Sequence, residues 1–281
     1  MRLFITGAPG KVMKETVRIV VKVGTSTLTY ENGKTNLHRM EQICRVLSDL
    51  QNRGKEIILV SSGAIAVGVG KVGLDHRPTD TVKKQALAAI GQCELMFLYD
   101  KFFGEYNCTV AQLLLTKNVT DAARGKANVQ NTFRELIDMG VIPVINENDT
   151  VDTAELEGAN YGDNDMLSAI VAEIVAADAL IILTDTDGLF DSDPRINPNA
   201  KIIHRVSFMG DEINGLAGDS GSNRGTGGMS TKVYAAKYAT ESGIATYIAG
   251  GSKPGNLYDI LSGKEVGTYF CPSSSRKGDN K

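Results

Sequence analysis

Short runs of β-branched and apolar residues alternate with longer amphipathic stretches from residue 17 to about residue 270. Six of the short runs are predicted strands: Val17–Val23, Glu56–Val60, Thr109–Leu114, Val141–Ile145, Ala179–Leu183 and Ala245–Ile248. The stretches between them are predicted helices: Leu37–Asn52, Thr79–Phe103, Lys126–Met139, Asp165–Ala176 and Ser230–Ser242. Most of these strands are apolar on both faces, as in a parallel sheet that helices cover on both sides. The pattern predicts an α/β fold, a three-layer αβα sandwich with a mostly parallel central sheet.

Composition narrows the class of protein. A net charge of −3 gives no electrostatic footprint for nucleic acid or an anionic membrane, and no apolar run approaches the roughly 18 residues that span a bilayer. The four cysteines are dispersed without a CxxC pair, so we expect reduced, mostly buried thiols of a cytoplasmic protein. The three histidines are equally scattered, which argues against a zinc site.

One domain accounts for most of the chain, because no Pro- or Ser-rich linker divides it. We expect a leader of unassigned role at residues 1–16, a single domain at residues 17–271 and a disordered polar tail at residues 272–281. The glycine- and serine-rich segment 217–228 is predicted to be a mobile loop next to the site.

Small and polar residues follow several of the predicted strands. Lys22 lies near the end of the first strand and is followed by Gly24-Thr25-Ser26, where backbone N–H groups and a cation could approach phosphate oxygens. A lysine at a strand end is equally compatible with a plain surface position. The segment Ser61–Ala66 suits an anion site or tight packing about equally.

Polar clusters also follow the fourth and fifth strands. Asn146–Asp149 comes directly after a strand and could hold an ammonium group or a metal, although an ordinary Asx turn would look the same. Gly162–Asp165 opens a helix, where one residue would serve as N-cap and the others remain available for a site. Thr184 and Asp185 follow the fifth strand, where a nucleotide's ribose or base would be read.

The most informative segment is Gly225–Lys232, in which glycines precede a helix with Lys232 in its first turn. A helix N-terminus and a lysine together could clamp transferring phosphate oxygens. The fragment Gly7–Lys11 lacks the spacing of a P-loop, and no GxGxxG motif occurs in the first βαβ unit. The residues therefore favour phosphoryl transfer from a nucleoside triphosphate to a small molecule.

Taken together, these segments resemble the amino acid kinase family, and within it the members that phosphorylate the γ-carboxylate of L-glutamate. The resemblance covers about residues 17 to 270 and is carried by Val20–Ser26, Ser61–Ala66, Pro143–Asp149, Gly162–Asp165, Thr184-Asp185 and Gly225–Lys232. It implies the amino acid kinase fold and ATP-dependent formation of L-glutamyl 5-phosphate, the first step of proline biosynthesis.

The resemblance also implies roles for individual residues. The implied catalytic residues are Lys22, Lys232 and Asp165, with the lysines neutralising the transferring phosphoryl group and Asp165 orienting them. The implied glutamate-binding residues are Ser62, Gly63, Asn146, Asp149 and Asn164. The implied ATP-binding residues are Lys22, Thr184, Asp185, Thr226, Gly227, Gly228, Met229, Ser230, Thr231 and Lys232. Mg²⁺ is expected on the ATP phosphates, without direct ligation by the protein.

Regulation and assembly are expectations from the same resemblance. We expect feedback inhibition by proline and a homo-oligomer, a dimer or a tetramer. Many bacterial members carry a C-terminal PUA domain, and we expect none here. The stretch Glu155–Tyr161 departs from the short basic segment of some members, with acidic and neutral residues where a lysine is often found.

Two alternatives stay open at this point. The chain could act on another acceptor of the superfamily, such as aspartate, N-acetylglutamate, carbamate, a nucleoside monophosphate or isopentenyl phosphate, although Asn146–Asp149 with Gly162–Asp165 argues against it. It could instead be a non-catalytic amino-acid or nucleotide sensor. Retention of both Lys22 and Lys232 argues against a sensor, since binding alone would tolerate loss of one.

Overall fold

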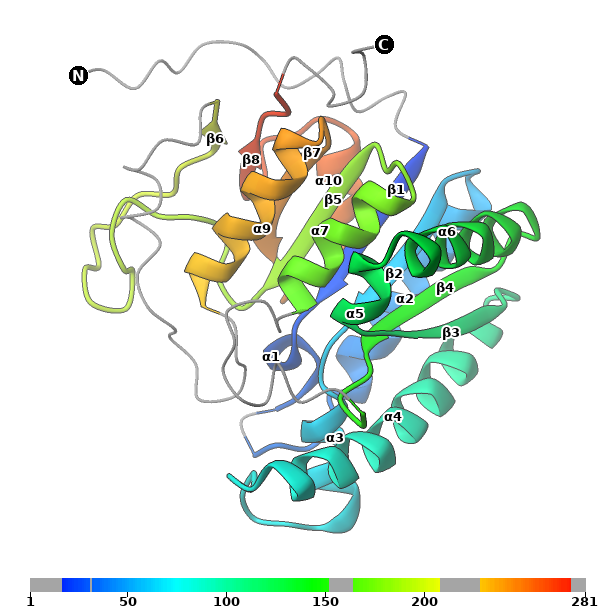
Figure 1. The fold of residues 1–281 in the computed structure, drawn as a ribbon. Coiled ribbons are helices and arrows are strands. Elements are labelled where there is room, and N and C mark those ends of the chain that lie inside the picture. The colour runs from blue at the N-terminus through cyan, green and yellow to red at the C-terminus, as the bar shows by residue number, and fades with distance from the viewer. Residues whose placement is uncertain (1–16, 31, 152–163, 208–227, 274–281) are drawn as a thin grey trace.

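The computed structural model describes residues 17–30, 32–151, 164–207 and 228–273. Within these ranges, eight strands form one sheet in the order β3-β4-β2-β1-β5-β7-β8-β6 (Figure 1). The strands are β1 (Arg18–Val23), β2 (Glu56–Ser61), β3 (Val110–Leu115), β4 (Ile142–Glu147), β5 (Ala179–Thr184), β6 (Arg205–Val206), β7 (Ala245–Gly250) and β8 (Thr268–Phe270). Every neighbouring pair is parallel except β7 and β8. The six predicted strands and the mostly parallel sheet are confirmed.

Helices connect the strands and cover the sheet. They are α1 (Thr25–Leu28), α2 (Leu37–Asn52), α3 (Ala64–Val72), α4 (Thr81–Gly104), α5 (Lys117–Asp121), α6 (Ala123–Asp138), α7 (Asn164–Ile174), α9 (Met229–Glu241) and α10 (Asn256–Leu261). The five predicted helices are confirmed to within three residues at each end. Local capping explains two of the starts, because Asn36 accepts a hydrogen bond from the Arg39 N–H and Asp80 accepts one from the Lys83 N–H.

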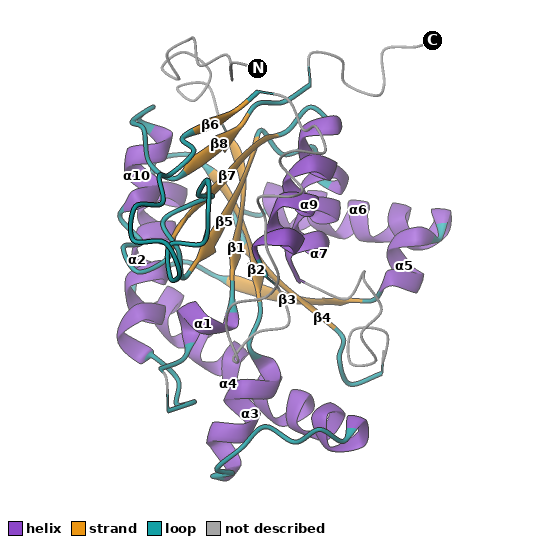
Figure 2. Cartoon of the chain, turned by 90° about the vertical axis from the view of Figure 1, so that its left-hand side faces the viewer, coloured by secondary structure: helices purple, strands orange, loops and turns teal. Residues whose placement is uncertain are grey.

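Helices cover both faces of the sheet (Figure 2), and alternation along the strands separates two hydrophobic cores. Ile19, Val21 and Val23 of β1 point into a core with α2, α4 and α10, whereas Val20 points into a second core with α6, α7 and α9. Side chains of a strand alternate between faces, so Lys22 shares the side of Val20 and points toward α7 and α9. Burying each large apolar side chain contributes about 1.5–3 kcal/mol. The two cores therefore hold the central strands, and with them Lys22, in place.

The strands near the two edges of the sheet are more polar or shorter than the predicted apolar strands. β3 is an edge strand, and its Gln112 is exposed. β6 forms the other edge, with β8 between it and β7; neither was predicted, because two or three residues are too short to show an alternation.

Helices α3 and α4 pack backbone against backbone. A side chain at Gly91 of α4 would place its Cβ 1.8 Å from the carbonyl oxygen of Ala64, which excludes any residue larger than glycine. For Ala64 in the segment Ser61–Ala66, tight packing is therefore the role that the structure supports. The contact also holds α4 close to the ends of β2 and β4.

The cysteines and the absence of a membrane span among the described residues can be compared with the predictions as well. Cys44 and Cys108 are buried, Cys271 is half-buried and Cys93 is exposed, so the prediction of mostly buried thiols was too broad, although all four are free. No helix among the described residues is long and apolar enough to cross a membrane. The leader 1–16, the stretch 155–161, segment 217–227 and residues 274–281 lie outside the described residues.

Candidate active site

The polar residues singled out in the sequence gather at the carboxyl ends of the parallel strands. β1 ends beside Lys22, β4 ends beside Asn146, and β5 ends at Thr184, while α7 and α9 begin with Asp165 and Lys232 in their first turns. In open parallel sheets, this edge is where ligands bind. The order β4-β2-β1-β5 brings the ends of these four strands side by side.

At the centre of this edge, one carboxylate holds two lysines. The Nζ atom of Lys22 lies 2.6 Å from Oδ1 of Asp165, and the Nζ atom of Lys232 lies 3.0 Å from its Oδ2. The three residues come from β1, α7 and α9, at widely separated places in the chain. The cluster Lys22–Asp165–Lys232 therefore forms only when the helices pack on the sheet, and it matches the predicted catalytic set.

Burial makes this cluster electrostatically strong. Asp165 is 0% exposed, Lys22 is 3% exposed and Lys232 is 7% exposed. Burial alone would raise the pKa of Asp165, but the ammonium groups of Lys22 and Lys232 outweigh it and hold that pKa well below its usual range. The carboxylate is therefore ionised at neutral pH. Two ammonium groups held at one place suit an anion such as a transferring phosphoryl group.

The start of α9 supports the same carboxylate. The Thr231 hydroxyl lies 2.8 Å from Oδ2 of Asp165 and 2.9 Å from the carbonyl oxygen of Gly228. Lys232 also donates to the Gly228 carbonyl oxygen at 3.3 Å. Thr231, predicted from the sequence only as an ATP-binding residue, thus contacts the Lys22–Asp165–Lys232 cluster itself.

The structure describes some, but not all, of the other predicted ATP-binding residues. Met229 and Ser230 lie in the first turn of α9, and Gly228 directly precedes it. Thr226 and Gly227 lie outside the described residues.

The predicted glutamate-binding residues lie at the ends of β2 and β4 and at the start of α7. Ser62, Asn146, Asp149 and Asn164 are all buried. Gly63 adopts φ +100, a left-handed conformation that favours glycine, and it begins α3. The buried Oδ1 of Asn164 has no hydrogen-bond partner among the described residues. Since buried polar atoms are rarely left unpaired, an acceptor here favours a ligand with a donor group.

Asn146 is held by a residue that sequence reasoning missed. Its Nδ2 donates to Oε1 of Gln92 at 2.8 Å, and its Oδ1 accepts from the Glu147 N–H at 2.9 Å. Gln92 lies in the middle of α4, and no local pattern marks it. Glu147 is buried as well, and the sequence named it only as part of its segment. The Asn146 amide is therefore oriented by the protein on both sides.

Thr184 and Asp185 stand at the end of β5, as predicted. The buried Thr184 hydroxyl donates to the Asp185 carboxylate at 3.0 Å, and Asp185 is exposed. The Thr184 carbonyl oxygen accepts from the Gly251 N–H at 2.7 Å. Gly251, in the loop after β7, was not singled out in the sequence. The arrangement leaves the exposed Asp185 carboxylate at the carboxyl end of β5.

Comparison with known proteins identifies the family to which this chain belongs. The amino acid kinase family model matches residues 17–250. A glutamate 5-kinase of Clostridium perfringens is 54% identical over 270 residues, covering 96% of this chain and 99% of that protein. A glutamate 5-kinase of Listeria welshimeri is 51% identical over 92% of this chain and 94% of its own length. A third, from a Thermoanaerobacter species, is 51% identical and is covered over 70% of its length.

A solved structure agrees on the fold. The crystal structure of a UMP kinase from Bacillus anthracis superposes with a TM-score of 0.62 at 17% identity, covering 92% of this chain and 97% of that one. At this identity the likeness shows the fold alone. The family model and the long, highly identical relatives carry the rest: this chain belongs to the amino acid kinase family.

Proposed function

We propose that this chain transfers the γ-phosphoryl group of ATP to the γ-carboxylate of L-glutamate, giving ADP and L-glutamyl 5-phosphate. This reaction is the first step of proline biosynthesis. The observation that carries the proposal is the buried Lys22–Asp165–Lys232 cluster at the carboxyl edge of the sheet. Membership of a kinase family and a 54% identical glutamate 5-kinase that aligns over nearly its whole length support it.

The chemistry needs charge stabilisation more than proton transfer. The glutamate γ-carboxylate is already ionised at neutral pH and can attack phosphorus directly, so the reaction requires no general base. A bond forms between a carboxylate oxygen and the γ-phosphorus, and the bond from phosphorus to the bridging oxygen of ADP breaks. Negative charge is spread over the phosphoryl oxygens during transfer, and positioning with electrostatics supplies most of the catalysis.

Lys22 and Lys232 would supply that stabilisation from opposite sides of Asp165. Because each ammonium is already held by a separate oxygen of one carboxylate, the two lysines are oriented before substrate arrives. Asp165 is thus a positioning residue in this scheme. Thr231 fixes the Asp165 carboxylate in turn through its hydroxyl.

Glutamate would occupy the space between the ends of β2 and β4 and the start of α7. The Asp149 carboxylate and the Asn164 side-chain oxygen are acceptors suited to the substrate ammonium group. Ser62 and the Gly63 backbone lie at the junction of β2 and α3, where a hydroxyl and an N–H could bind a substrate carboxylate. Asn146, oriented by Gln92, completes the proposed set.

ATP would lie along the ends of β5 and the start of α9, with Thr184 and Asp185 near its nucleoside and Gly228–Lys232 near its phosphates. Among the described residues, no three His, Cys, Asp or Glu side chains are grouped to hold a metal ion. Mg²⁺ bound through nucleotide phosphates and water needs no such group. It would then enter with ATP and neutralise phosphate charge.

Proline inhibition and oligomer formation rest on the resemblance to the family, and a cytoplasmic location rests on the dispersed cysteines. We keep as proposals that proline inhibits the enzyme at or near the glutamate site, that the chain forms a dimer or tetramer, and that it is cytoplasmic. Inhibition is checked by adding proline to the assay, and assembly by light scattering of the purified chain.

The direct test is ADP release by the purified chain with MgATP and each of L-glutamate, L-aspartate, N-acetylglutamate and UMP. Hydroxylamine in the same reaction traps an acyl phosphate as the hydroxamate. We expect turnover and hydroxamate with glutamate alone. Turnover on another acceptor would overturn the substrate but leave the phosphoryl-transfer cluster standing, and no turnover on any acceptor would overturn the enzymatic proposal.

A further inference from the structure

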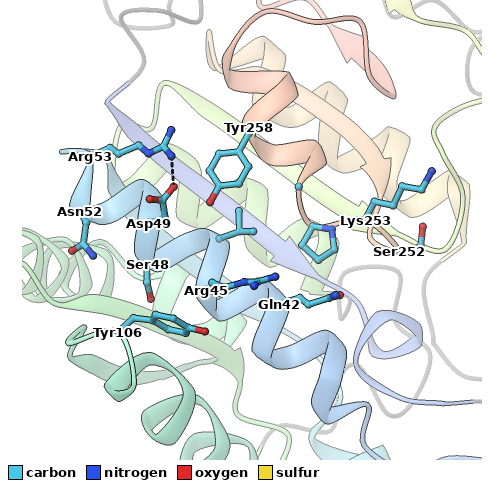
Figure 3. Close-up of a pocket in the computed structure, with 13 residues that line it drawn as sticks. Gln42, Arg45, Ser48, Asp49, Asn52, Arg53, Tyr106, Ser252, Lys253 and Tyr258 are labelled. Atoms are coloured by element: carbon cyan, nitrogen blue, oxygen red, sulfur yellow. Dashed lines mark ion pairs between the residues drawn. The ribbon is translucent and has the colours of Figure 1, made fainter.

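A second hollow lies away from the candidate active site, between α2 and the chain that follows β7 (Figure 3). Its volume is about 720 Å³, within the range of small-molecule sites. Side chains of α2 form one wall, and Ser252–Gly255 with Tyr258 of α10 form the opposite wall. Val46 and Pro254, both buried, supply apolar surface. We call this hollow the α2–α10 groove.

Positive charge dominates the α2–α10 groove. Its lining includes Arg45, Arg53 and Lys253 against a single acidic side chain, Asp49. Asp49 is already engaged, because it pairs with Arg53 at 2.8 Å. Arg53 also lies over the Tyr258 ring, 5.2 Å from its centroid. This network neutralises one cation of the groove and leaves two.

The two remaining cations are weakly engaged. Arg45 approaches Glu41 only at 3.8 Å, and Glu41 already accepts a 2.6 Å hydrogen bond from the Tyr106 hydroxyl. Lys253 is exposed and has no ion pair among the described residues. An anion in the groove would therefore gain two cationic contacts without displacing a strong internal pair.

Hydrogen-bond donors extend the same preference. The Tyr258 hydroxyl is already engaged with Asp49, whose hydrogen bond, together with burial, raises the pKa of Tyr258 to about 12. Gln42 and Asn52 of α2 add amide N–H groups. The lining thus offers cations and neutral donors around a small apolar floor.

The loop that forms one wall of the groove also contacts the proposed ATP site. The Gly251 N–H donates to the Thr184 carbonyl oxygen at 2.7 Å, and Gly251 accepts from Arg39 of α2 at 2.6 Å. A Cβ at Gly251 would lie 2.9 Å from the side chain of Thr27, in the helix that follows the glycine turn after β1. Gly251 is thus wedged between α1 and β5, directly before the groove residues Ser252 and Lys253.

We propose that the α2–α10 groove binds a small metabolite anion bearing carboxylate or phosphate groups, and that its occupancy changes the affinity for ATP through Gly251. Arg45 and Lys253 contact the anionic groups, while Val46 and Pro254 contact the carbon skeleton. The effect on ATP rests on the proposed function, whereas binding in the groove does not.

Calorimetry of the full chain without Mg²⁺ tests the binding, with citrate and inorganic phosphate as separate probes. The variant Arg45→Gln with Lys253→Gln removes both cations and keeps side-chain length. The matched control is Lys83→Gln with Lys101→Gln, which removes two exposed charges from α4. We expect the groove variant to bind at least one probe about tenfold more weakly than wild type, and the control to match wild type. Equal affinities in all three proteins, or no binding of either probe, would overturn the proposal.

Kinetics test the coupling. With free Mg²⁺ held constant, the probe that binds the groove should change the KM for ATP in wild type and in the control but not in the groove variant. The same KM response in the groove variant would assign the effect to the active site and overturn the coupling. If the chain turned over no acceptor at all, the calorimetric result would still decide whether the groove binds anions.

Discussion

Among the carboxylates that are paired with cations, Asp165 and Asp49 have sharply different surroundings. Asp165 at the carboxyl edge is 0% exposed and holds the ammonium groups of Lys22 and Lys232. The side chain of Asp49, in the α2–α10 groove, is 40% exposed and pairs with Arg53 one helical turn away. Both ion pairs have short distances, so distance alone does not separate them.

Exposure to solvent distinguishes the two ion pairs. Around Asp49, water screens the attraction, and exposed pairs contribute about 0.2–1 kcal/mol. Around Asp165, burial costs free energy that only close cations can offset, and removing one partner of a buried pair costs about 3–5 kcal/mol. Burial thus makes the first cluster rigid and specific, whereas exposure leaves the second exchangeable. The first suits catalysis and the second suits reversible binding.

The largest expected effect is on turnover in Lys232→Ala. Losing a cation that stabilises the transferring phosphoryl group lowers kcat by about 10³-fold or more. Glutamate binding, measured by calorimetry, should stay near wild type, because the proposed mechanism places Lys232 against the phosphoryl group and not the amino acid. Lys237→Ala on the same helix is the control and should turn over normally. Wild-type-like turnover in Lys232→Ala would remove the cluster from the mechanism.

Asp165→Asn tests the buried side of the comparison by stability. The substitution leaves two buried ammonium groups without their carboxylate, and we expect a loss of about 3–5 kcal/mol in the free energy of unfolding. Urea unfolding of both proteins at pH 7 measures it. If the free energy of unfolding fell by less than an exposed ion pair contributes, burial would not strengthen this interaction.

The pH dependence of the same pair has a defined sign. The folded pKa of Asp165 lies below its unfolded value of about 3.9, so its stabilisation is complete above that pH and is lost as the pH falls toward the folded pKa. Between pH 5 and about pH 3, wild type should therefore lose more stability than Asp165→Asn. Parallel curves for the two proteins would contradict the lowered pKa.

Asp149→Ala should raise the KM for glutamate and leave the KM for ATP nearly unchanged. Loss of a charged hydrogen bond costs about 1.5–3 kcal/mol, which raises the KM for glutamate about tenfold to a hundredfold. The KM for ATP should change little, because the proposed ATP residues lie at β5 and α9. Asp138→Ala, an exposed carboxylate at the end of α6, is the matched control. Equal increases in both KM values would point to a structural role for Asp149.

Gln92→Met should have a smaller effect of the same kind. It leaves the buried Asn146 amide without its acceptor, which costs about 1–3 kcal/mol. We expect a higher KM for glutamate with a nearly unchanged kcat, since the proposed role of the Asn146 amide is to orient substrate and not to take part in transfer. Gln112→Met on the exposed edge strand is the control. A fall in kcat at unchanged KM would assign Gln92 another role.

The smallest effect is expected for Asp49→Asn. An exposed pair contributes at most about 1 kcal/mol, and salt screens it. Urea unfolding at low and at high ionic strength measures the difference from wild type, which should shrink as salt rises. A salt-independent loss as large as that of Asp165→Asn would erase the distinction between the two carboxylates.

Much of the fold could be predicted because its signals are local. Helix Leu37–Asn52 was predicted with the observed bounds, since an amphipathic period and an Asn36 cap both lie within a few residues. The short strands β6 and β8 are too short to show such a period and were missed. The candidate site residues were found because polar side chains interrupt apolar strands at their ends.

Other features depended on long-range packing. Gln92 reaches Asn146 across 54 positions, and no pattern in α4 distinguishes it from its neighbours. The α2–α10 groove combines residues more than 200 positions apart, such as Arg45 and Lys253. Side chains brought together by packing leave no periodic trace in either segment.

By itself, the sequence determined the alternation of strands and helices, the parallel sheet and the identity of the polar residues at its edge. These follow from hydrophobic periodicity and turn chemistry, which act over a few residues. Only the tertiary structure decided that Lys22 and Lys232 share one carboxylate and that Asp165 stays ionised without contact with solvent. The reason is physical: a charge–charge interaction depends on distance in space and on exclusion of water, and both arise only when the helices close over the sheet.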